Sequence, residues 1–374
     1  MRRGKNNQNG NRVAPDGKRP ISLKQLAGYL ELSPTALSLV LNETEAANAI
    51  PQETKDRIFE AARKFNYKPN YIARALRVQR THTLGVLVPE LSGGYSAEVV
   101  GGIEEHLLKE GYFYFVASHH HRQDLLKRYP QLMLERCVEG LIAVDTPHLK
   151  TALSPVVCVS GHDNAPGMTN IVLDHERAAL LALEHLLELG HRRIAVIKGQ
   201  VFSSDTEVRW AAIRDVARRL KAPIKPESVT QLEGDSPSPE TGYVATKKLL
   251  EKREGFTALF AFNDISAIGA ISALREAGFR VPEDVSVIGF DDIPAAAFHN
   301  PALTTIKQPL HEMGKLAAEH LLKRIAGGPD APFLEEVMIE PELIVRQSTM
   351  QARKTADAGR QAGKRAYVKV TQLS

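Results

Sequence analysis

Three polar residues each come directly after a run of apolar residues, where a buried strand would end. Ser160 follows PVVCV, Asn263 follows ALFAF and Asp291 follows VSVIGF. In sheets of parallel strands, ligands bind beyond the carboxyl ends of the strands. These side chains are therefore candidates for hydrogen bonding a small polar molecule. Asn263 has a simpler alternative, because an asparagine before a helical pattern is also a common helix cap.

Other residues that could do chemistry lack the partners that the chemistry requires. The run His119–His121 has no carboxylate or cysteine at metal-ligand spacing, so we expect no metal site and no cofactor. Ser203 and Asp205 lie near Arg209, but no histidine follows at a spacing typical of nucleophilic catalysis. The glycines of LSGGYSAE are not followed by the Lys-Ser/Thr of a phosphate loop. We expect a protein that is not an enzyme.

The strands that would position these residues form part of a long alternation of strand and helix patterns. Helical patterns follow most of the apolar runs, for example at 97–111, 175–190, 265–278 and 311–325. Buried strands separated by helices predict parallel sheets. About ten strands exceed one usual sheet, so we expect an α/β body of two doubly wound lobes. Strands are expected at 84–90, 112–118, 140–145, 155–160, 193–199, 228–234, 258–263, 285–292 and 304–308.

Three short helices are predicted before the body. Ser22 and Gln25 fit a capping box, and Ser33 followed by Pro34 fits the start of a second helix. A third apolar stripe runs from about residue 52 to 65. The pattern matches an all-α helix-turn-helix head, although periodicity alone fits a small helical bundle equally well.

In a helix-turn-helix the first residues of the second helix reach base edges in the major groove. Thr35 and Ser38 carry hydroxyls that bond bases or phosphates, and Leu39 suits contact with thymine methyl groups. The residues assigned to DNA contact in the head are Ser22, Ser33, Pro34, Thr35, Ser38, Leu39 and Asn42.

The charge of the chain is unevenly distributed. The 374 residues carry a net charge of +4 and are enough for two or three domains. Residues 1–80 hold 15 Lys/Arg against 7 Asp/Glu, residues 351–374 hold 6 against 1, and the remainder holds 27 against 36. A basic head on an acidic body favours a polyanionic partner for the head, although basic ends are often no more than solvated tails.

The sequence carries no export or membrane signal. No apolar stretch follows the basic N-terminus, and no run approaches the roughly 18 apolar residues of a membrane span. Cys137 and Cys158 lie in or beside apolar sequence, as buried free thiols usually do. We expect a cytoplasmic protein that associates with the nucleoid.

The segment LKQLAGYLELSPTALSLVLN resembles the signature V-A-x-x-A-G-V-S-x-x-T-V-S-R-V-L-N of the LacI/GalR repressor family. The resemblance continues through NYKPNYIARALR, LGHRRIAVIKG and FNDISAIGAISALREAGFRVPEDVSVIGFDDIP to RQST near residue 349. It implies a homodimeric repressor that binds a near-palindromic operator and responds to a small-molecule effector. Its body would be similar to periplasmic sugar-binding proteins, with a ligand cleft between two lobes.

NYKPNYIARALR is similar to the hinge of that family, in which a short helix forms on DNA and a leucine wedges into the minor groove. Carried over by position, Asn70 would cap this helix, Ala73 would face the partner hinge and Leu76 would be the wedge. Such a wedge partly unstacks a base step and bends the duplex. The other hinge residues assigned to DNA are Tyr71, Arg74 and Arg77.

The resemblance also implies an effector site. Arg209 matches the effector-clamping arginine, and Asn263 and Asp291 match a hydrogen-bonding pair. A guanidinium fork and a carboxylate grip adjacent hydroxyls, so a sugar or sugar derivative is the expected effector. The remaining effector positions are Tyr95, Ser96, Ser160, Ser203, Asp205 and Ser236.

Two positions depart from the family pattern. Leu39 stands where the family often has an arginine that reads guanine, which leaves the operator bases open. Ser236 stands where some relatives stack an aromatic ring on the ligand, which weakens both a sugar and a purine as the effector.

The expected organisation has five parts. A disordered basic leader (1–20) precedes the helix-turn-helix head (21–68), a hinge helix and linker (69–80), the two-lobe core (81–349) and a disordered basic tail (350–374). Two rival functions are a solute-binding module of a transport system and an α/β enzyme acting on sugars. The first would need an export signal and no head, and the second an acid–base or nucleophile constellation.

Overall fold

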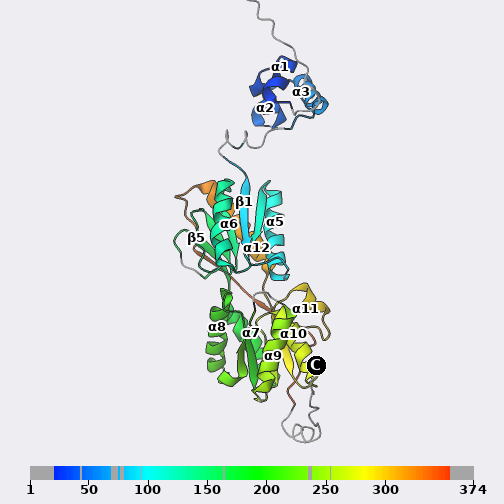
Figure 1. Cartoon of the computed structure of the whole chain (residues 1–374), viewed down its shortest axis with the longest axis vertical. Helices are drawn as coiled ribbons and strands as arrows, with labels where there is room; N and C mark the ends of the chain where they lie inside the picture. The colour runs from blue at the N-terminus through cyan, green and yellow to red at the C-terminus, as the bar shows by residue number, and fades with distance from the viewer. Residues whose placement is uncertain are drawn as a thin grey trace, which may run out of the picture. The chain divides into compact units, whose positions relative to one another are not determined.

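The computed structural model describes residues 21–42, 44–68, 75, 80–92, 94–162, 165–234, 238–252 and 254–353. The chain divides into two compact units, residues 1–81 and 82–374 (Figure 1). Several predicted segments lie outside the described residues. They are the leader 1–20, Asn70, Tyr71, Ala73, Arg74, Leu76, Arg77, Ser236 and the tail from residue 354.

The first unit is a small helical domain whose helices start at the predicted caps. Its elements are α1 (Leu23–Leu30), α2 (Pro34–Leu41), the 3-10 helix η1 (Glu45–Ala49) and α3 (Gln52–Lys64). The Ser22 hydroxyl accepts from the backbone N–H of Gln25, whose side chain returns the bond, so the capping box is present. The Ser33 hydroxyl accepts from the backbone N–H of Ala36 at 3.1 Å.

One apolar cluster holds the three helices together. Leu26, Leu37 and Ile58, one from each helix, are fully buried in it. Burial of a leucine or isoleucine side chain is worth roughly 1.5–3 kcal/mol, so these three residues are a main source of stability for a domain this small. Leu23 and Phe65 are only partly buried at the margin of the cluster.

The second unit contains two six-stranded sheets, and each defines a lobe. The order is β11-β5-β4-β3-β1-β2 in the first lobe and β12-β10-β9-β8-β6-β7 in the second. All strand pairs are parallel except β10 with β12. The strands are β1 (Thr83–Val88), β2 (Phe113–Ser118), β3 (Leu141–Val144), β4 (Val156–Val159), β5 (Met168–Leu173), β6 (Ile194–Lys198), β7 (Val229–Gln231), β8 (Ala258–Phe260), β9 (Ser286–Asp291), β10 (Thr304–Lys307), β11 (Glu336–Ile339) and β12 (Glu342–Ile344).

Helices connect and cover the strands, as the alternating pattern predicted (Figure 1). Each sheet is buried against helices by its own apolar clusters, so each lobe has its own core. The helices are α5 (Gly94–Lys109), α6 (Gln123–Glu135), α7 (His175–Glu188), α8 (Asp205–Arg219), η2 (Pro226–Ser228), α9 (Pro239–Glu251), α10 (Asp264–Glu276), α11 (Pro294–Phe298) and α12 (Leu310–Gly327).

The chain passes between the lobes three times, after β5, after β10 and between β11 and β12. The first lobe therefore takes its last helix, α12, and its last strand, β11, from the far end of the chain. Strands β5, β11 and β12 are additional to the nine that the sequence predicted. Residues 350–353, assigned to the disordered tail, are instead bonded to the second lobe, for example through Met350 N–H to Ser286 Oγ at 3.1 Å.

In each lobe, a helical glycine allows two helices to pack in close contact. A Cβ on Gly102 of α5 would lie 1.8 Å from the backbone oxygen of His311 in α12. In the second lobe, a Cβ on Gly269 of α10 would lie 1.8 Å from the backbone oxygen of Pro239 in α9. Only glycine permits such an approach of two backbones.

The two cysteines differ in burial. Cys158 is buried as expected, but Cys137 is exposed, and neither forms a disulfide with a described residue. Apolar neighbours in sequence did not bury Cys137 because it lies in the turn after α6.

Among the described residues, no helix combines the length and apolar character needed to cross a membrane.

Candidate effector site between two lobes and a candidate DNA-reading helix

A buried arginine lines a cavity that residues of both lobes form. Arg209, on the first turns of α8, is 3% exposed. Its guanidinium donates to Asp205 Oδ2 at 2.9 Å and to the backbone oxygen of Phe262 at 2.6 Å. The guanidinium also stacks over the rings of Phe290 and Phe262, at 3.6 and 4.4 Å from the ring centroids. Its Nε is buried and has no partner among the described residues.

Asp291 ends strand β9 beside this arginine, as the strand-end rule predicted. Its carboxylate accepts from Gln308 Nε2 at 2.6 Å. Burial raises the pKa of Asp291 to about 7, and repulsion from Asp205 and Asp145 adds to the rise, against the pull of Arg209 and Gln308. A ligand hydroxyl or amine near this carboxyl would supply a hydrogen bond that desolvation has removed.

Asn263 also lies at the cavity, but its side chain already has a structural role. It is the N-cap of α10, and its Oδ1 accepts from the backbone N–H of Ser266 at 2.9 Å. The amide NH₂ is not used by the cap. The structure is therefore compatible with both proposed roles of Asn263, the helix cap and the hydrogen bond to a ligand.

The first lobe contributes hydroxyls from the ends of its own strands. Tyr95, at the start of α5, shares a 2.7 Å hydrogen bond with Ser160, which directly follows β4. Burial and the nearby Asp205 and Asp145 carboxylates raise the pKa of the Tyr95 phenol well above its ordinary value, so the hydroxyl stays protonated. Ser96, next along the helix, is buried at the same cavity.

A second set of contacts joins the lobes directly. Asp145, after strand β3, accepts from the backbone N–H of Ser204 at 2.8 Å and from its hydroxyl at 2.6 Å. The Ser204 hydroxyl also contacts the backbone oxygen of Ser160. Burial, followed by repulsion from Asp205, raises the pKa of Asp145. These bonds hold the loop before α8 against the first lobe.

The structure brings these side chains to one cavity of about 70 Å³, named here the interlobe cavity. Seven of the nine expected effector residues line it. Ser160 is not among the lining residues but is hydrogen bonded to Tyr95, which is. Ser236 lies outside the described residues. Its lining consists of Pro89, Glu90, Tyr95, Ser96, His121 and Asp145 from the first lobe and Gln200, Phe202, Ser203, Asp205, Arg209, Phe262, Asn263 and Asp291 from the second.

Sequence reasoning missed several residues of this lining. Asp145 and Gln200 also follow apolar strands, so the rule that found Ser160 could have found them. The rings of His121 and Phe202 stack with centroids 3.6 Å apart, although nothing in the sequence links the two. Phe202 and Phe262 also line the cavity, although the sequence analysis assigned neither ring to it.

The head presents part of the predicted DNA-reading surface. Pro34 and Thr35 are exposed at the start of α2, and Leu39 is half-buried. Ser38 differs from expectation: it is 7% exposed, and Asn42 Nδ2 bonds to its backbone oxygen at 2.6 Å and its hydroxyl at 3.3 Å. Its position one turn after Thr35 rotates it toward the head core, so Thr35 is the better placed of the two hydroxyls.

Comparisons with known proteins agree with both parts. A family model described as a periplasmic binding protein-like domain matches residues 183–349. The chain is 34% identical over 337 residues to the HTH-type transcriptional repressor PurR of Haemophilus influenzae (strain PittEE), covering 87% of this chain and 98% of the relative.

Solved structures give the same result. A lac repressor dimer bound to operator and the anti-inducer ONPF is similar with a TM-score of 0.77 and 25% identity, covering 89% of this chain and all of that chain. A LacI family regulator from Enterococcus faecium with bound ribose is similar with a TM-score of 0.63 and 28% identity, covering 72% of this chain and all of that one.

Proposed function

Because the chain belongs to the LacI/GalR family of transcription regulators, we propose that it is a homodimeric repressor whose hold on a near-palindromic operator is set by a small polar effector in the interlobe cavity. One observation carries this proposal. A helical head with a capped, exposed second helix and a two-lobed body with a buried polar cavity occur in one chain, and the repressor match spans 98% of the relative.

The head would read DNA through the start of α2. Thr35 is exposed there, and the Ser33 cap leaves the helix N-terminus directed at solvent. Helix N-termini and short hydroxyl side chains suit phosphates and base edges. Two copies of the head would contact two half-sites, since a two-fold symmetric dimer matches a near-palindromic site. The hinge residues Asn70, Tyr71, Ala73, Arg74, Leu76 and Arg77 stay predictions from the sequence.

The cavity supports a hydroxyl-bearing effector, a sugar or sugar derivative. Arg209 and Asp291 offer donors and acceptors to adjacent oxygens. The His121–Phe202 stack and Phe262 offer apolar ring faces of the kind that sugars contact. The relative from Enterococcus faecium with bound ribose supports the same class.

The size of the cavity connects the effector to DNA binding. At about 70 Å³ it is well below the roughly 300 Å³ of a small ligand pocket. An effector therefore binds only if the lobes part or the lining side chains move. A molecule that binds one lobe spacing more tightly than another shifts the equilibrium between them, and a coupling of about 1–3 kcal/mol changes operator occupancy substantially.

The proposal assigns no catalytic step to this chain and places its action in the cytoplasm, on chromosomal operators. The test is selection of preferred duplexes by the full chain from random DNA, followed by fluorescence anisotropy with excess competitor. We expect one near-palindromic sequence to be enriched and bound by two chains. Equal affinity for all duplexes, with or without a library of sugars, would refute it.

A matched variant tests the hinge separately. Leu76→Ala should weaken binding to the selected operator while the thermal shift caused by an effector stays unchanged. Unchanged operator affinity would remove the wedge role. A parallel screen for glycosidase and kinase turnover addresses the rival enzyme, which turnover without operator binding would favour.

A further inference from the structure

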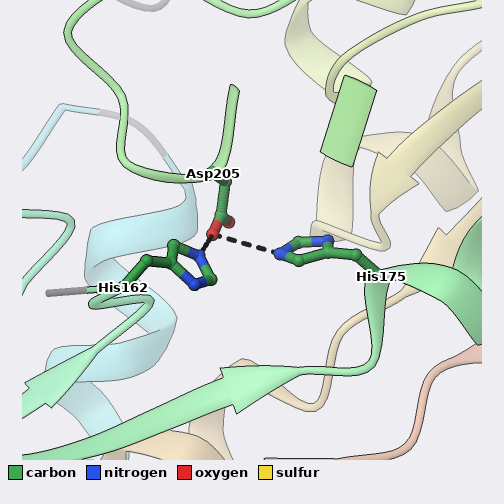
Figure 2. Close-up of side chains that lie close together, drawn as sticks. All are labelled: His162, His175 and Asp205. Carbon is green, nitrogen blue, oxygen red and sulfur yellow. Dashed lines mark hydrogen bonds and ion pairs between the residues drawn. The ribbon is translucent and has the colours of Figure 1, made fainter. Parts of the chain in front are cut away.

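Two histidines and an aspartate converge at the edge of the lobe interface (Figure 2). Asp205 Oδ1 lies 2.7 Å from His162 Nε2 and 3.2 Å from His175 Nε2. The side chains of His175 and Asp205 are 4% and 6% exposed, and that of His162 is 21% exposed. Figure 2 shows both imidazoles directed at the same carboxylate oxygen.

The three donors come from different parts of the fold. His162 lies in the connection between β4 and β5 of the first lobe. His175 and Asp205 are the first residues of α7 and α8 in the second lobe. Helices and the hydrogen-bonded loop before α8 fix the second-lobe pair, so the group is held by the fold rather than by local sequence.

The donor set is that of a divalent transition metal. Two imidazole nitrogens and one carboxylate oxygen suit Zn²⁺ and its neighbours, whereas Mg²⁺ and Ca²⁺ prefer oxygen ligands. Bonds of about 2.0–2.2 Å place tetrahedral ligand atoms roughly 3.3–3.5 Å apart. The three donor atoms already lie within 4.8 Å of one another, so small side-chain rotations bring them to a metal.

The charges around the group favour a cation. The carboxyl groups of Asp145 and Asp291 lie near that of Asp205. Arg209 is bonded to Asp205 Oδ2, which leaves Oδ1 facing the two histidines. A divalent cation at Oδ1 would gain an anionic ligand without breaking the Asp205–Arg209 pair.

The group is also accessible. A surface groove of about 1140 Å³ is lined in part by His162 and His175, with Asp174 and Glu176 beside them. A metal could enter from this groove without passing through the interlobe cavity. The groove side also leaves a fourth coordination position for water or a ligand.

We propose that His162, His175 and Asp205 form a binding site for one divalent transition-metal ion of the Zn²⁺ class, which bridges the two lobes. With one ligand from the first lobe and two from the second, the metal resists their separation. The inference does not require that the chain bind DNA. The same side chains could serve as a metal-free hydrogen-bonded clamp, and metal stoichiometry separates that alternative from the proposal.

The experiment uses tag-free full-length protein, treated with chelator, equilibrated with Zn²⁺ and freed of excess metal. We expect about one Zn²⁺ per chain by elemental analysis, with Mg²⁺ failing to compete. His162→Gln, which alters the most exposed ligand, should weaken Zn²⁺ binding in calorimetry at least about 10-fold, since even outer partners of a metal site cost that much. His185→Gln is the matched control, because His185 lies on α7 and bonds Thr349 instead.

Two results would overturn the site: no retained Zn²⁺ in the wild type, or equal Zn²⁺ binding by the wild type and His162→Gln. If the variant does not fold, anomalous scattering at the zinc edge from crystals of the wild-type protein decides the matter. A peak between the three side chains supports the site, and no peak or a peak elsewhere excludes it.

Discussion

The two lobes of the body share one architecture and differ in what they bring to the cavity between them. Both sheets have the same strand order with one strand added at the edge, and both hold a helix pair together through close glycines. The second lobe, however, carries Arg209, Asp205 and Asp291, whereas the first contributes the hydroxyls of Tyr95 and Ser96 and the carboxyl groups of Glu90 and Asp145.

This difference indicates a division of labour on a repeated scaffold. The second lobe provides Arg209, the one arginine or lysine among the described lining residues, which would recognise an effector, and the first provides hydroxyls, two carboxyl groups and the ring of His121. If so, changes in the second lobe should alter both stability and recognition. Equivalent changes in the first lobe should mainly alter closure.

Removing the arginine should have the largest effect. Arg209→Ala leaves Asp205 and Asp291 buried without their cation, and losing one partner of a buried pair costs about 3–5 kcal/mol. Chemical denaturation measures this loss, and effector response in an operator-binding assay should disappear. Arg209→Lys is the control: it keeps the charge but not the planar fork, so it should recover part of the stability and little of the response. A fully responsive Arg209→Ala variant would contradict the division.

Each lobe has a buried carboxyl group with a raised pKa, Asp145 in the first and Asp291 in the second, and the pH dependence of stability measures the effect of each. Asp291 titrates near pH 4 when unfolded and near 7 when folded. The folded state binds more protons between these values, so the free energy of unfolding falls as pH rises from about 4 to about 7 and then levels off. A tenfold change in proton affinity is worth about 1.4 kcal/mol, so the fall is on the order of 2–4 kcal/mol.

Asp291→Asn should flatten this profile, measured by denaturation at fixed ionic strength with chelator present. Asp145 of the first lobe also has a raised pKa, so Asp145→Asn should change the profile in the same direction. We expect the smaller change there, because Ser203 and Ser204 hydrogen bonds to the Asp145 carboxylate oppose the rise. A larger change in the pH profile from Asp145→Asn than from Asp291→Asn would contradict this expectation.

Substitutions at the helical glycines Gly102 and Gly269 test whether close helix packing matters equally in the two lobes. Gly102→Ala and Gly269→Ala each force a methyl group against a backbone oxygen of the neighbouring helix. Overpacking of this kind costs about 1–3 kcal/mol, and we expect similar losses in the two lobes by thermal denaturation. Gly28→Ala in the head, where nothing lies within 4 Å of the added carbon, should instead be neutral or stabilising. A loss confined to one lobe would show that the two crossings are not equivalent.

The smallest effect is expected at a hydroxyl of the first lobe. Tyr95→Phe removes the hydrogen bond with Ser160 and should cost about 0.5–1.5 kcal/mol. Effector affinity should fall less than in Arg209→Lys, as isothermal calorimetry would show. An effect larger than that of the arginine variant would place recognition in the first lobe.

The sequence predicted the repeated parts of the fold well, because periodic patterns report on local structure. The caps at Ser22 and Ser33 and the strands that lead to Ser160 and Asp291 were visible as short motifs. Strand β11 was not, since its residues alternate between exposed and partly buried and its partner β5 lies more than 160 residues earlier. A short strand of this kind is defined by pairing across the chain, which a local pattern does not contain.

The candidate sites divide in the same way. Arg209 and Asp291 could be named from their positions in a family motif and at a strand end. The group of His162, His175 and Asp205 could not, because no metal motif has its spacing and the three side chains meet only through the lobe interface. Burial was also beyond local reasoning, as the inward-turned Ser38 and the exposed Cys137 show.

The three passages of the chain between lobes determine when each part can be completed on the ribosome. The head needs only residues near the N-terminus, so it is able to fold early. The first lobe waits for α12 and β11, roughly 200 residues after α5. At about 5–20 residues per second of synthesis, that delay is on the order of 10–40 s. During it, the apolar face of β1 and α5 has no final cover, so a nascent chain is expected to engage chaperones over this interval.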